Sequence, residues 1–135
     1  MNQKAEVEIR RSADLSLKWT AKVKNFSDLF SQFRATRDGA FLVHVRGNHQ
    51  INKVNDVCVE VYSQDGLKVS YRVSDFLEAL PPFKRAMSLS IDPQYEWIKS
   101  IDPSVSQERL GITLFDGRYV QVSIKKHAVA QHDNP

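Results

Sequence analysis

Cysteine and long apolar runs are scarce in this 135-residue chain. Its single cysteine, Cys58, has no second thiol to pair with, which excludes the intrachain disulfides of small secreted domains. No apolar run approaches the ~20 residues that a transmembrane helix needs, and residues 1–6 lack the apolar core of a signal peptide. These absences predict a cytoplasmic protein that makes no contact with a membrane.

The motifs of common enzyme classes are also missing. The sequence contains no GxSxG nucleophile elbow, no GxGxxG or GxxxxGK(S/T) phosphate-binding loop and no HExxH metal motif. His44 and His49 are five residues apart, and side chains along a strand alternate between its faces, so their rings need not converge on a metal. Cys58 has no histidine beside it that would activate a thiolate. We therefore expect no catalytic residue, no metal, no cofactor and no enzymatic activity.

The composition of the chain is that of an ordinary globular domain. Hydrophobic residues make up 41% of the sequence and charged residues 26%, close to the averages of folded proteins. A chain of this length is expected to build one hydrophobic core. We predict a single domain over residues 1–135, in which residues 126–135 form a disordered polar tail.

Alternation of apolar and polar residues predicts several β-strands. The alternating or β-former-rich segments are residues 6–11, 15–23, 40–46, 57–62, 67–73, 87–91, 110–115 and 119–124. Asp65-Gly66 and Asp116-Gly117 each separate two of these segments, and Asp-Gly favours the tight turn of a β-hairpin. The sequence therefore predicts two hairpins, one around each Asp-Gly pair.

Two segments change to the spacing of an amphipathic helix. The first apolar stripe consists of Phe26, Leu29, Phe30 and Phe33. The second consists of Phe76, Leu77, Leu80 and Phe83. Asn25 is a suitable N-cap for the first helix, and Pro81-Pro82 would end the second. Asp92-Pro93 also favours the start of a short third helix over residues 94–101.

An internal similarity links the two predicted strand-to-helix transitions. Residues 17–33 align with residues 67–83 at a constant offset of 50. The identical pairs are Leu17/Leu67, Lys18/Lys68, Val23/Val73, Phe26/Phe76 and Phe33/Phe83. Duplication of one β-α-β unit would produce this alignment, although any two amphipathic strand-helix units also look alike. Both explanations stay open, and a duplication would give half-repeats at residues 6–63 and 59–125.

These patterns predict an α+β fold. We expect an antiparallel or mixed sheet of about seven to nine strands with two main amphipathic helices. If the internal similarity is a true repeat, the fold is a tandem β-α-β-β-β duplication.

Residues 67–80, LKVSYRVSDFLEAL, followed by the strand at 87–91, resemble half of one domain of the DNA sliding clamps, the processivity factors of replicative polymerases. The resemblance covers residues 15–125 and has no diagnostic motif. In that family the helices line a ring and offer basic side chains to duplex DNA. The resemblance implies such a role for Lys24, Arg34, Arg37, Lys84 and Arg85. It also implies a homo-oligomer, because one domain closes a ring only by self-assembly.

Basic side chains recur on one face of the strand at residues 15–23 and just beyond it. Lys18, Lys22 and Lys24 have the parity opposite to that of the apolar residues Trp19, Ala21 and Val23. Such a face is suited to phosphates, whose counterions it would release, and the net charge of +3 permits a polyanionic partner. The alternative is an ordinary solvated sheet face, since acidic residues are scattered along the chain.

Three aromatic residues, Tyr95, Trp97 and Tyr119, fall outside the apolar stripes and are candidates for contact with a ligand. Trp97 lies in the proline-bounded segment 94–101, and tryptophan is enriched at protein interfaces. Burial of Trp97 across the end of the sheet is the alternative. We assign Tyr95 and Trp97 to a candidate protein interface.

The sequence favours a non-enzymatic binding module that contacts nucleic acid through a basic face, as a clamp-like accessory protein would. The predicted phosphate contacts are Lys18, Lys22, Lys24, Arg34, Arg37, Lys84 and Arg85. A small protein-interaction module, such as an inhibitor, an immunity protein or an assembly factor, is the alternative. A small-ligand enzyme is a third reading, because catalytic residues converge from distant positions in many folds.

Overall fold

The computed structural model describes residues 3–26, 32–47, 51, 53–77, 97–102, 105–106 and 108–132. The strands in these ranges are β1 (Gln3–Arg10), β2 (Leu17–Phe26), β3 (Gln32–Ala35), β4 (Leu42–Val45), β5 (Val57–Ser63), β6 (Gly66–Arg72), β7 (Ile98–Ile101), β8 (Arg109–Leu114), β9 (Tyr119–Ser123) and β10 (Val129–His132). A single turn of 3-10 helix, η2 (Val73–Asp75), follows β6.

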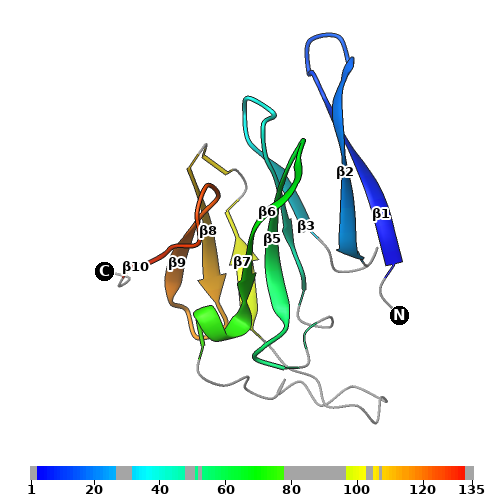
Figure 1. Ribbon diagram of the computed structural model, residues 1–135. Helices are drawn as coiled ribbons and strands as arrows, with labels where there is room; N and C mark the ends of the chain where they lie inside the picture. The colour runs from blue at the N-terminus through cyan, green and yellow to red at the C-terminus, as the bar shows by residue number, and fades with distance from the viewer. Residues whose placement is uncertain are drawn as a thin grey trace.

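The strands form three antiparallel sheets in which neighbours in the chain are neighbours in space. β1 pairs with β2, the order β3-β4-β5-β6 makes a second sheet, and the order β10-β9-β8-β7 makes a third. Figure 1 shows the β3–β6 sheet between the blue β1–β2 hairpin on one side and the yellow-to-red β7–β10 sheet on the other. Sequential antiparallel pairing of this kind needs only short connections.

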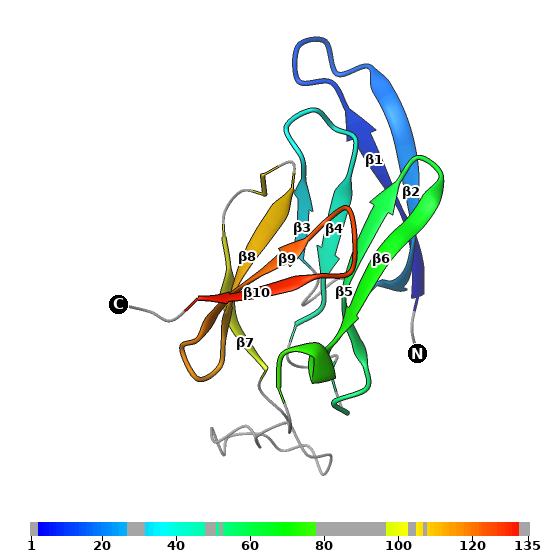
Figure 2. The ribbon, with the colours of Figure 1, turned by 60° about the vertical axis from the view of Figure 1, so that its left-hand side comes forward.

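The main core lies between the two four-stranded sheets. Alternate residues of β4, β5 and β6, including Val43, Val61 and Tyr71, face Ile112 and Val122 of the β7–β10 sheet. All of these side chains are buried. The view in Figure 2 shows the two sheets facing each other. Burial of interdigitating apolar faces is the main stabilising contribution in such a sandwich.

The β1–β2 hairpin covers the outer face of the β3–β6 sheet. Trp19 and Val23 of the hairpin pack in one cluster with Leu42 of β4 and Tyr62 of β5. The Trp19 Nε1–H donates a hydrogen bond of 2.7 Å to the Gly39 carbonyl oxygen in the β3–β4 connection. Because β4 has a sheet on one face and a hairpin on the other, all four of its residues are buried.

Both predicted Asp-Gly hairpins are confirmed. Asp65-Gly66 joins β5 to β6, and Asp116-Gly117 lies between β8 and β9. Gly66 and Gly117 have φ values of +114° and +89°, which a residue with a Cβ rarely adopts. Local turn chemistry therefore determined these two connections.

The expectation of an α+β fold with two main helices is wrong. Strands are the dominant regular structure of the described residues, which contain no α-helix. Phe26 ends β2, whereas Phe33 lies in β3 and stacks on His44 with 4.8 Å between ring centroids. Phe76 and Leu77 follow η2 and are buried in the main core. The described members of the two apolar stripes therefore lie on two strands and in a turn that faces the core, not on helices. The other members, Leu29, Phe30, Leu80 and Phe83, lie outside the described residues.

Three further expectations about the fold need correction. The described strands number ten rather than seven to nine, and residues 98–101 form β7 rather than the end of a helix. A tandem β-α-β-β-β duplication is wrong because the described parts of its two helices are strand and 3-10 turn, and the β3–β6 sheet spans the boundary between the half-repeats. The strand expected at residues 87–91 lies outside the described residues.

The expected disordered tail from residue 126 is also wrong for residues 126–132. Val129–His132 form the edge strand β10, which pairs with β9 in register from Val129↔Val122 to His132↔Tyr119. The polar composition of this segment suits an edge strand that has one neighbour. Within the described residues, no helix is long and apolar enough to cross a bilayer.

Candidate functional site

The β7–β10 sheet carries a groove on its outward side, near the connection from β9 to β10. The volume of this groove is about 400 Å³. It is lined by Glu108, Arg109, Gln121, Ser123, Lys125, Lys126, Ala128, Val129 and Ala130, a set that we call the basic groove. Strand alternation explains its position, because Leu110 and Val122 point into the core while Arg109 and Gln121 point outward.

A tyrosine of the opposite sheet holds the segment that carries the two lysines. The Tyr71 hydroxyl lies 2.6 Å from the Ser123 carbonyl oxygen, 3.0 Å from that of Lys126 and 3.1 Å from that of Ala128. Burial raises the pKa of Tyr71, so the hydroxyl keeps its one proton, which it donates to one of these carbonyl oxygens, and it accepts a hydrogen bond from the Ala128 N–H. His127 stacks on the Tyr71 ring with 4.7 Å between centroids. These contacts fix the backbone from which Lys125 and Lys126 extend into solvent.

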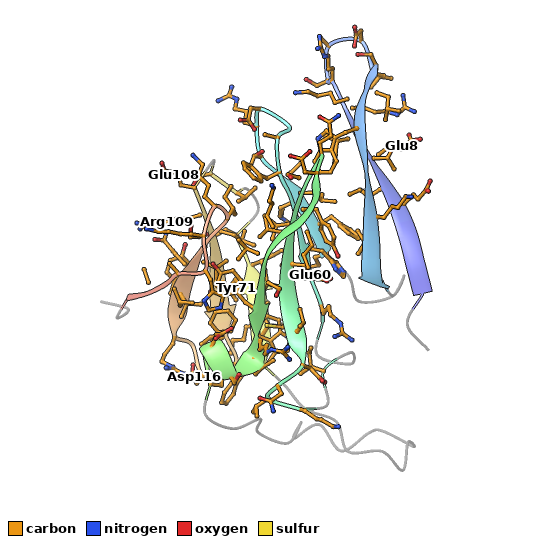
Figure 3. All side chains as sticks on the ribbon, in the orientation of Figure 1. Glu8, Glu60, Tyr71, Glu108, Arg109 and Asp116 are labelled. Carbon is orange, nitrogen blue, oxygen red and sulfur yellow. The ribbon has the colours of Figure 1, made fainter. Side chains whose placement is uncertain are left out.

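Positive charge dominates the basic groove. Arg109, Lys125 and Lys126 give it three cationic side chains against one carboxylate, that of Glu108. All four side chains are exposed, and Figure 3 shows Glu108 and Arg109 together at the start of β8. None of them takes part in the salt bridges found among the described residues. The groove therefore presents uncompensated positive charge to solvent.

Beside the groove, Tyr119 lies across the outward surface of the sheet. Its hydroxyl is 2.5 Å from Asp102 Oδ2 at the end of β7, so the side chain passes from β9 over β8. A Cβ built on Gly111 of β8 would lie 2.0 Å from the Tyr119 hydroxyl and 2.6 Å from Cζ. The hydrogen bond with Asp102, and secondarily burial, raises the pKa of Tyr119. The hydroxyl end of the Tyr119 side chain is therefore held above a glycine.

Gly111→Ala is expected to lower the free energy of unfolding by about 1–3 kcal/mol, because the new methyl group overlaps the Tyr119 hydroxyl and the Asp102 carboxylate. Urea denaturation of the variant measures the loss. Ser100→Ala, on an exposed position of β7, is the control and should leave stability within about 0.5 kcal/mol of the parent. Equal stability of all three proteins would contradict the placement of Tyr119 over Gly111.

The predicted phosphate contacts that the structure describes, Lys18, Lys22, Arg34 and Arg37, are not among the residues that line the basic groove. Lys18 and Lys22 are exposed on β2, on the face opposite Trp19, as alternation required. Lys22 lies directly across from Glu6 in the register, so a carboxylate faces it. The Lys18 ammonium donates to the Asp38 carbonyl oxygen, 2.5 Å away. Arg37 is exposed in the same β3–β4 connection, so Lys18 and Arg37 are near one another but far in sequence from the groove residues.

Arg34 occupies a different position, where the edges of the two large sheets approach. Its Nε–H donates to the Asp102 carbonyl oxygen at 3.1 Å, and one terminal nitrogen donates to the Phe33 carbonyl oxygen at 2.9 Å. These contacts tie β3 to the end of β7, which is a structural role. The Lys24 side chain, Lys84 and Arg85 lie outside the described residues.

Trp97 of the candidate protein interface is buried in the main core. Its exposed fraction is 0%, and its Nε1–H donates to the Arg46 carbonyl oxygen at 3.1 Å. The ring also stacks with Phe76 at a centroid distance of 6.1 Å. This geometry fits the alternative given above, in which Trp97 is buried, whereas a protein interface would need an exposed indole. Tyr95 lies outside the described residues.

A second polar cluster was missed by sequence reasoning. His44 Nδ1 lies 3.0 Å from Glu60 Oε1, and the two residues are direct register partners on β4 and β5. Both are buried beneath the β1–β2 hairpin, with exposed fractions of 0% and 2%. Figure 3 shows Glu60 in the middle of the molecule. Its lack of solvent access makes this pair a structural feature of the hairpin interface rather than a site for a ligand.

Cys58 is an inert residue of β5. Its exposed fraction is 0%, and burial raises the pKa of its thiol well above the ordinary value. The thiol lies 3.5 Å from the Tyr71 carbonyl oxygen in the core. Cys58 therefore contributes packing, and no thiol chemistry reaches solvent from it.

The described residues contain two sites of note, the exposed basic groove with Tyr119 and the buried His44–Glu60 pair. No protein-family model, curated protein or solved structure matches the chain. Functional inference therefore depends on the chemistry of the site alone. Gln121 lies on the strand predicted at residues 119–124, and Arg109 directly precedes the one predicted at 110–115, but neither was a candidate site residue. Lys125 and Lys126 were counted among the scattered basic residues that could contact phosphate, and Lys126 begins the segment expected to be disordered.

Proposed function

We propose that the protein is a non-enzymatic module that binds nucleic acid, with phosphate groups in the basic groove. The observation that carries the proposal is the charge balance of the groove, whose lining has three cationic residues, Arg109, Lys125 and Lys126, and one acidic residue, Glu108. Exposed cations that have no carboxylate partner release counterions when they meet phosphates, which drives binding at low salt. A cytoplasmic location, where nucleic acid is accessible, is part of the proposal.

The floor of the groove supports the same reading. Gln121 and Ser123 add an amide and a hydroxyl to the lining of the groove. Arg109 reaches toward Gln121, with 3.5 Å between its terminal nitrogen and Oε1. Such polar side chains commonly hydrogen-bond to phosphate and sugar oxygens. The clamp resemblance gives no support, since a sliding clamp presents helices to DNA and the described residues contain none.

Binding of fluorescent single-stranded and duplex oligonucleotides, measured by anisotropy, tests the proposal. We expect a plot of log binding constant against log salt to have a slope of about −2 to −3, as three phosphate contacts would give. Replacement of Arg109, Lys125 and Lys126 by glutamine should bring this slope close to zero and remove most of the affinity at low salt.

A charge-matched control is available on the other side of the molecule. Lys18→Gln, Lys22→Gln and Arg37→Gln remove three cations that were predicted from the sequence and lie outside the groove. This control should keep the slope of the parent. If the control loses binding and the groove variant keeps it, the phosphates lie on the β1–β2 hairpin. If neither parent nor variant binds any oligonucleotide at low salt, the proposed function fails.

A protein-interaction module is the second candidate, favoured by the tip of the β1–β2 hairpin. Leu15 and Leu17 are 68% and 52% exposed there, which is unusual for large apolar side chains near each other. Leu15 has a φ of +61°, a strained value for a leucine. Failure of nucleic-acid binding together with recovery of a partner that requires Leu15 and Leu17 would favour this candidate.

A further inference from the structure

β10 is an edge strand whose outer side pairs with no strand in the described part of the chain. It is the red strand of Figure 2, at the end of the sheet order β10-β9-β8-β7. The Ser123 backbone N–H donates to the Ala128 carbonyl oxygen, so these two residues form a hydrogen-bonded pair of the ladder. Because hydrogen-bonded and non-hydrogen-bonded pairs alternate, Ala130 directs its backbone groups to β9, whereas Val129 and Gln131 direct theirs away from it. Two N–H and two carbonyl groups of β10 therefore face outward.

β10 also lacks the charged side chains that protect exposed edges from pairing. A charge in an edge strand discourages a further strand from adding to it. The other edge strands of the described sheets all carry charge: Glu6 and Glu8 in β1, Lys18 and Lys22 in β2, Arg34 in β3, Lys68 and Arg72 in β6, and Lys99 in β7. Val129–His132 contains no Asp, Glu, Lys or Arg. Of the edges in the described ranges, β10 is thus the one most open to strand addition.

A second copy of β10 fits this edge. In antiparallel orientation about a two-fold axis, Val129 of each chain lies opposite the partner's Gln131. Each such pair exchanges two hydrogen bonds, so the outward groups of both residues are satisfied in both chains. Ala130 then lies on the axis opposite the partner's Ala130, in a non-hydrogen-bonded pair, the type in which side chains approach most closely. The small side chain of alanine suits this contact.

The positive charge near β10 does not oppose the pairing. In antiparallel order, the Ala128 residues of the two chains lie four residues apart along the joined strands, which is about 14 Å. The connections that carry Lys125 and Lys126 precede Ala128 at opposite ends of the joined strands. They are therefore separated by more than the screening length of ~8 Å at physiological ionic strength.

We infer that two copies of this chain pair through β10 and join their four-stranded sheets into one antiparallel sheet, with Ala130 on the two-fold axis. Directly opposed residues share a face, and Ala130 lines the basic groove, so both grooves open on the same face of the joined sheet. A phosphate backbone therefore meets two grooves on one surface; this consequence, unlike the pairing, rests on the proposed function. A contact of four residues buries little surface, so the dimer is reversible, with a dissociation constant in the micromolar to millimolar range.

Sedimentation equilibrium without nucleic acid measures the pairing. Across the micromolar to millimolar range, we expect the mass of the parent to rise from that of one chain to that of two. Gln131→Pro removes an outward N–H and leaves the ladder with β9 intact, because proline is tolerated at such edge positions. It should raise the dissociation constant of the dimer by about 5- to 150-fold, the range for two hydrogen bonds lost in a symmetric dimer. Gln131→Ala keeps the N–H and, as the matched control, should dimerise like the parent.

An exchange of charge at the axis tests the register. Ala130→Lys places two ammonium groups opposite each other, and Ala130→Glu places two carboxylates there, so each variant alone should be largely monomeric. A mixture of the two variants should regain the dimer, because opposite charges then face each other. Thermal unfolding checks that each variant is folded.

Two results would overturn the inference. A parent that stays monomeric at every concentration would leave the edge to an extended segment of another protein. A parent dimer that neither Gln131→Pro nor the Ala130 variants weaken would place the contact on another surface. Because the experiment contains no nucleic acid, either result leaves the proposed function to its own test.

Discussion

Trp97→Ala is expected to lower the free energy of unfolding by about 3–5 kcal/mol, the range for truncation of a large buried aromatic side chain. The indole is fully buried between the two large sheets, so its removal leaves a cavity in the main core. The change also leaves the Arg46 carbonyl oxygen without the Nε1–H donor. Urea denaturation followed by circular dichroism measures the effect.

Two controls separate a core role of Trp97 from an interface role. Trp97→Phe keeps most of the volume and should cost clearly less than the alanine variant. Leu17→Ala, at a half-exposed apolar position, should change stability by less than about 0.5 kcal/mol. A Trp97→Ala protein that is as stable as the parent but loses a protein partner would restore the interface role that the sequence suggested.

Replacement of His44 in the buried His44–Glu60 pair is expected to lower the free energy of unfolding substantially. His44→Leu leaves the Glu60 carboxylate beneath the hairpin without its hydrogen bond to the histidine, and a buried polar group that loses its hydrogen-bond partner costs about 1–3 kcal/mol, or more when it is charged. In the double variant His44→Leu/Glu60→Leu, both polar groups are replaced by apolar ones that suit the surrounding cluster. This variant should recover most of the lost stability.

The double-mutant comparison has a clear failing result. If His44→Leu and Glu60→Leu each lower the free energy of unfolding and their effects add in the double variant, the two side chains are not coupled. The surface pair of Glu8 and Arg10, whose side chains are 52% and 45% exposed, is the control. Glu8→Gln should change stability by no more than about 1 kcal/mol, as is usual for a solvated ion pair.

Local chemistry predicted the strands and turns well. The alternation of Trp19, Ala21 and Val23 with polar neighbours identified both the strand β2 and its buried face. Gly66 and Gly117 identified two hairpins, since a tight turn needs backbone angles that glycine adopts easily. These features depend on residues close in sequence, which is why a single sequence sufficed.

The prediction of helices was wrong because it did not take tertiary packing into account. Phe26 and Phe33 have helical spacing, yet Phe26 ends one strand and Phe33 packs from another against His44 and the hairpin cluster. Spacing alone does not distinguish apolar residues on one helix from apolar residues on two strands joined by a short connection. Burial of β4 on both faces likewise depends on a hairpin that precedes it in the chain.

The candidate site was harder to predict than the fold. A basic face was expected, but the cationic residues that meet in the groove come from the start of β8 and the connection after β9. Their proximity depends on the β8–β9 register, which pairs Arg109 with Ser123, and on the anchoring of the β9–β10 connection by Tyr71. Neither the strand register nor the anchoring by Tyr71 can be recognised from the residues close by in the sequence.

The position of the hairpin in the chain bears on how the protein emerges from the ribosome. β1 and β2 are synthesised before β4 and β5, which carry Leu42 and Tyr62, the residues that cover the apolar side of the hairpin. Trp19 and its neighbours therefore stay uncovered on the nascent chain until translation has passed β5. Transiently exposed apolar surface of this kind is what chaperones recognise and what promotes aggregation. Truncated chains that end before Tyr62 should therefore need chaperone protection.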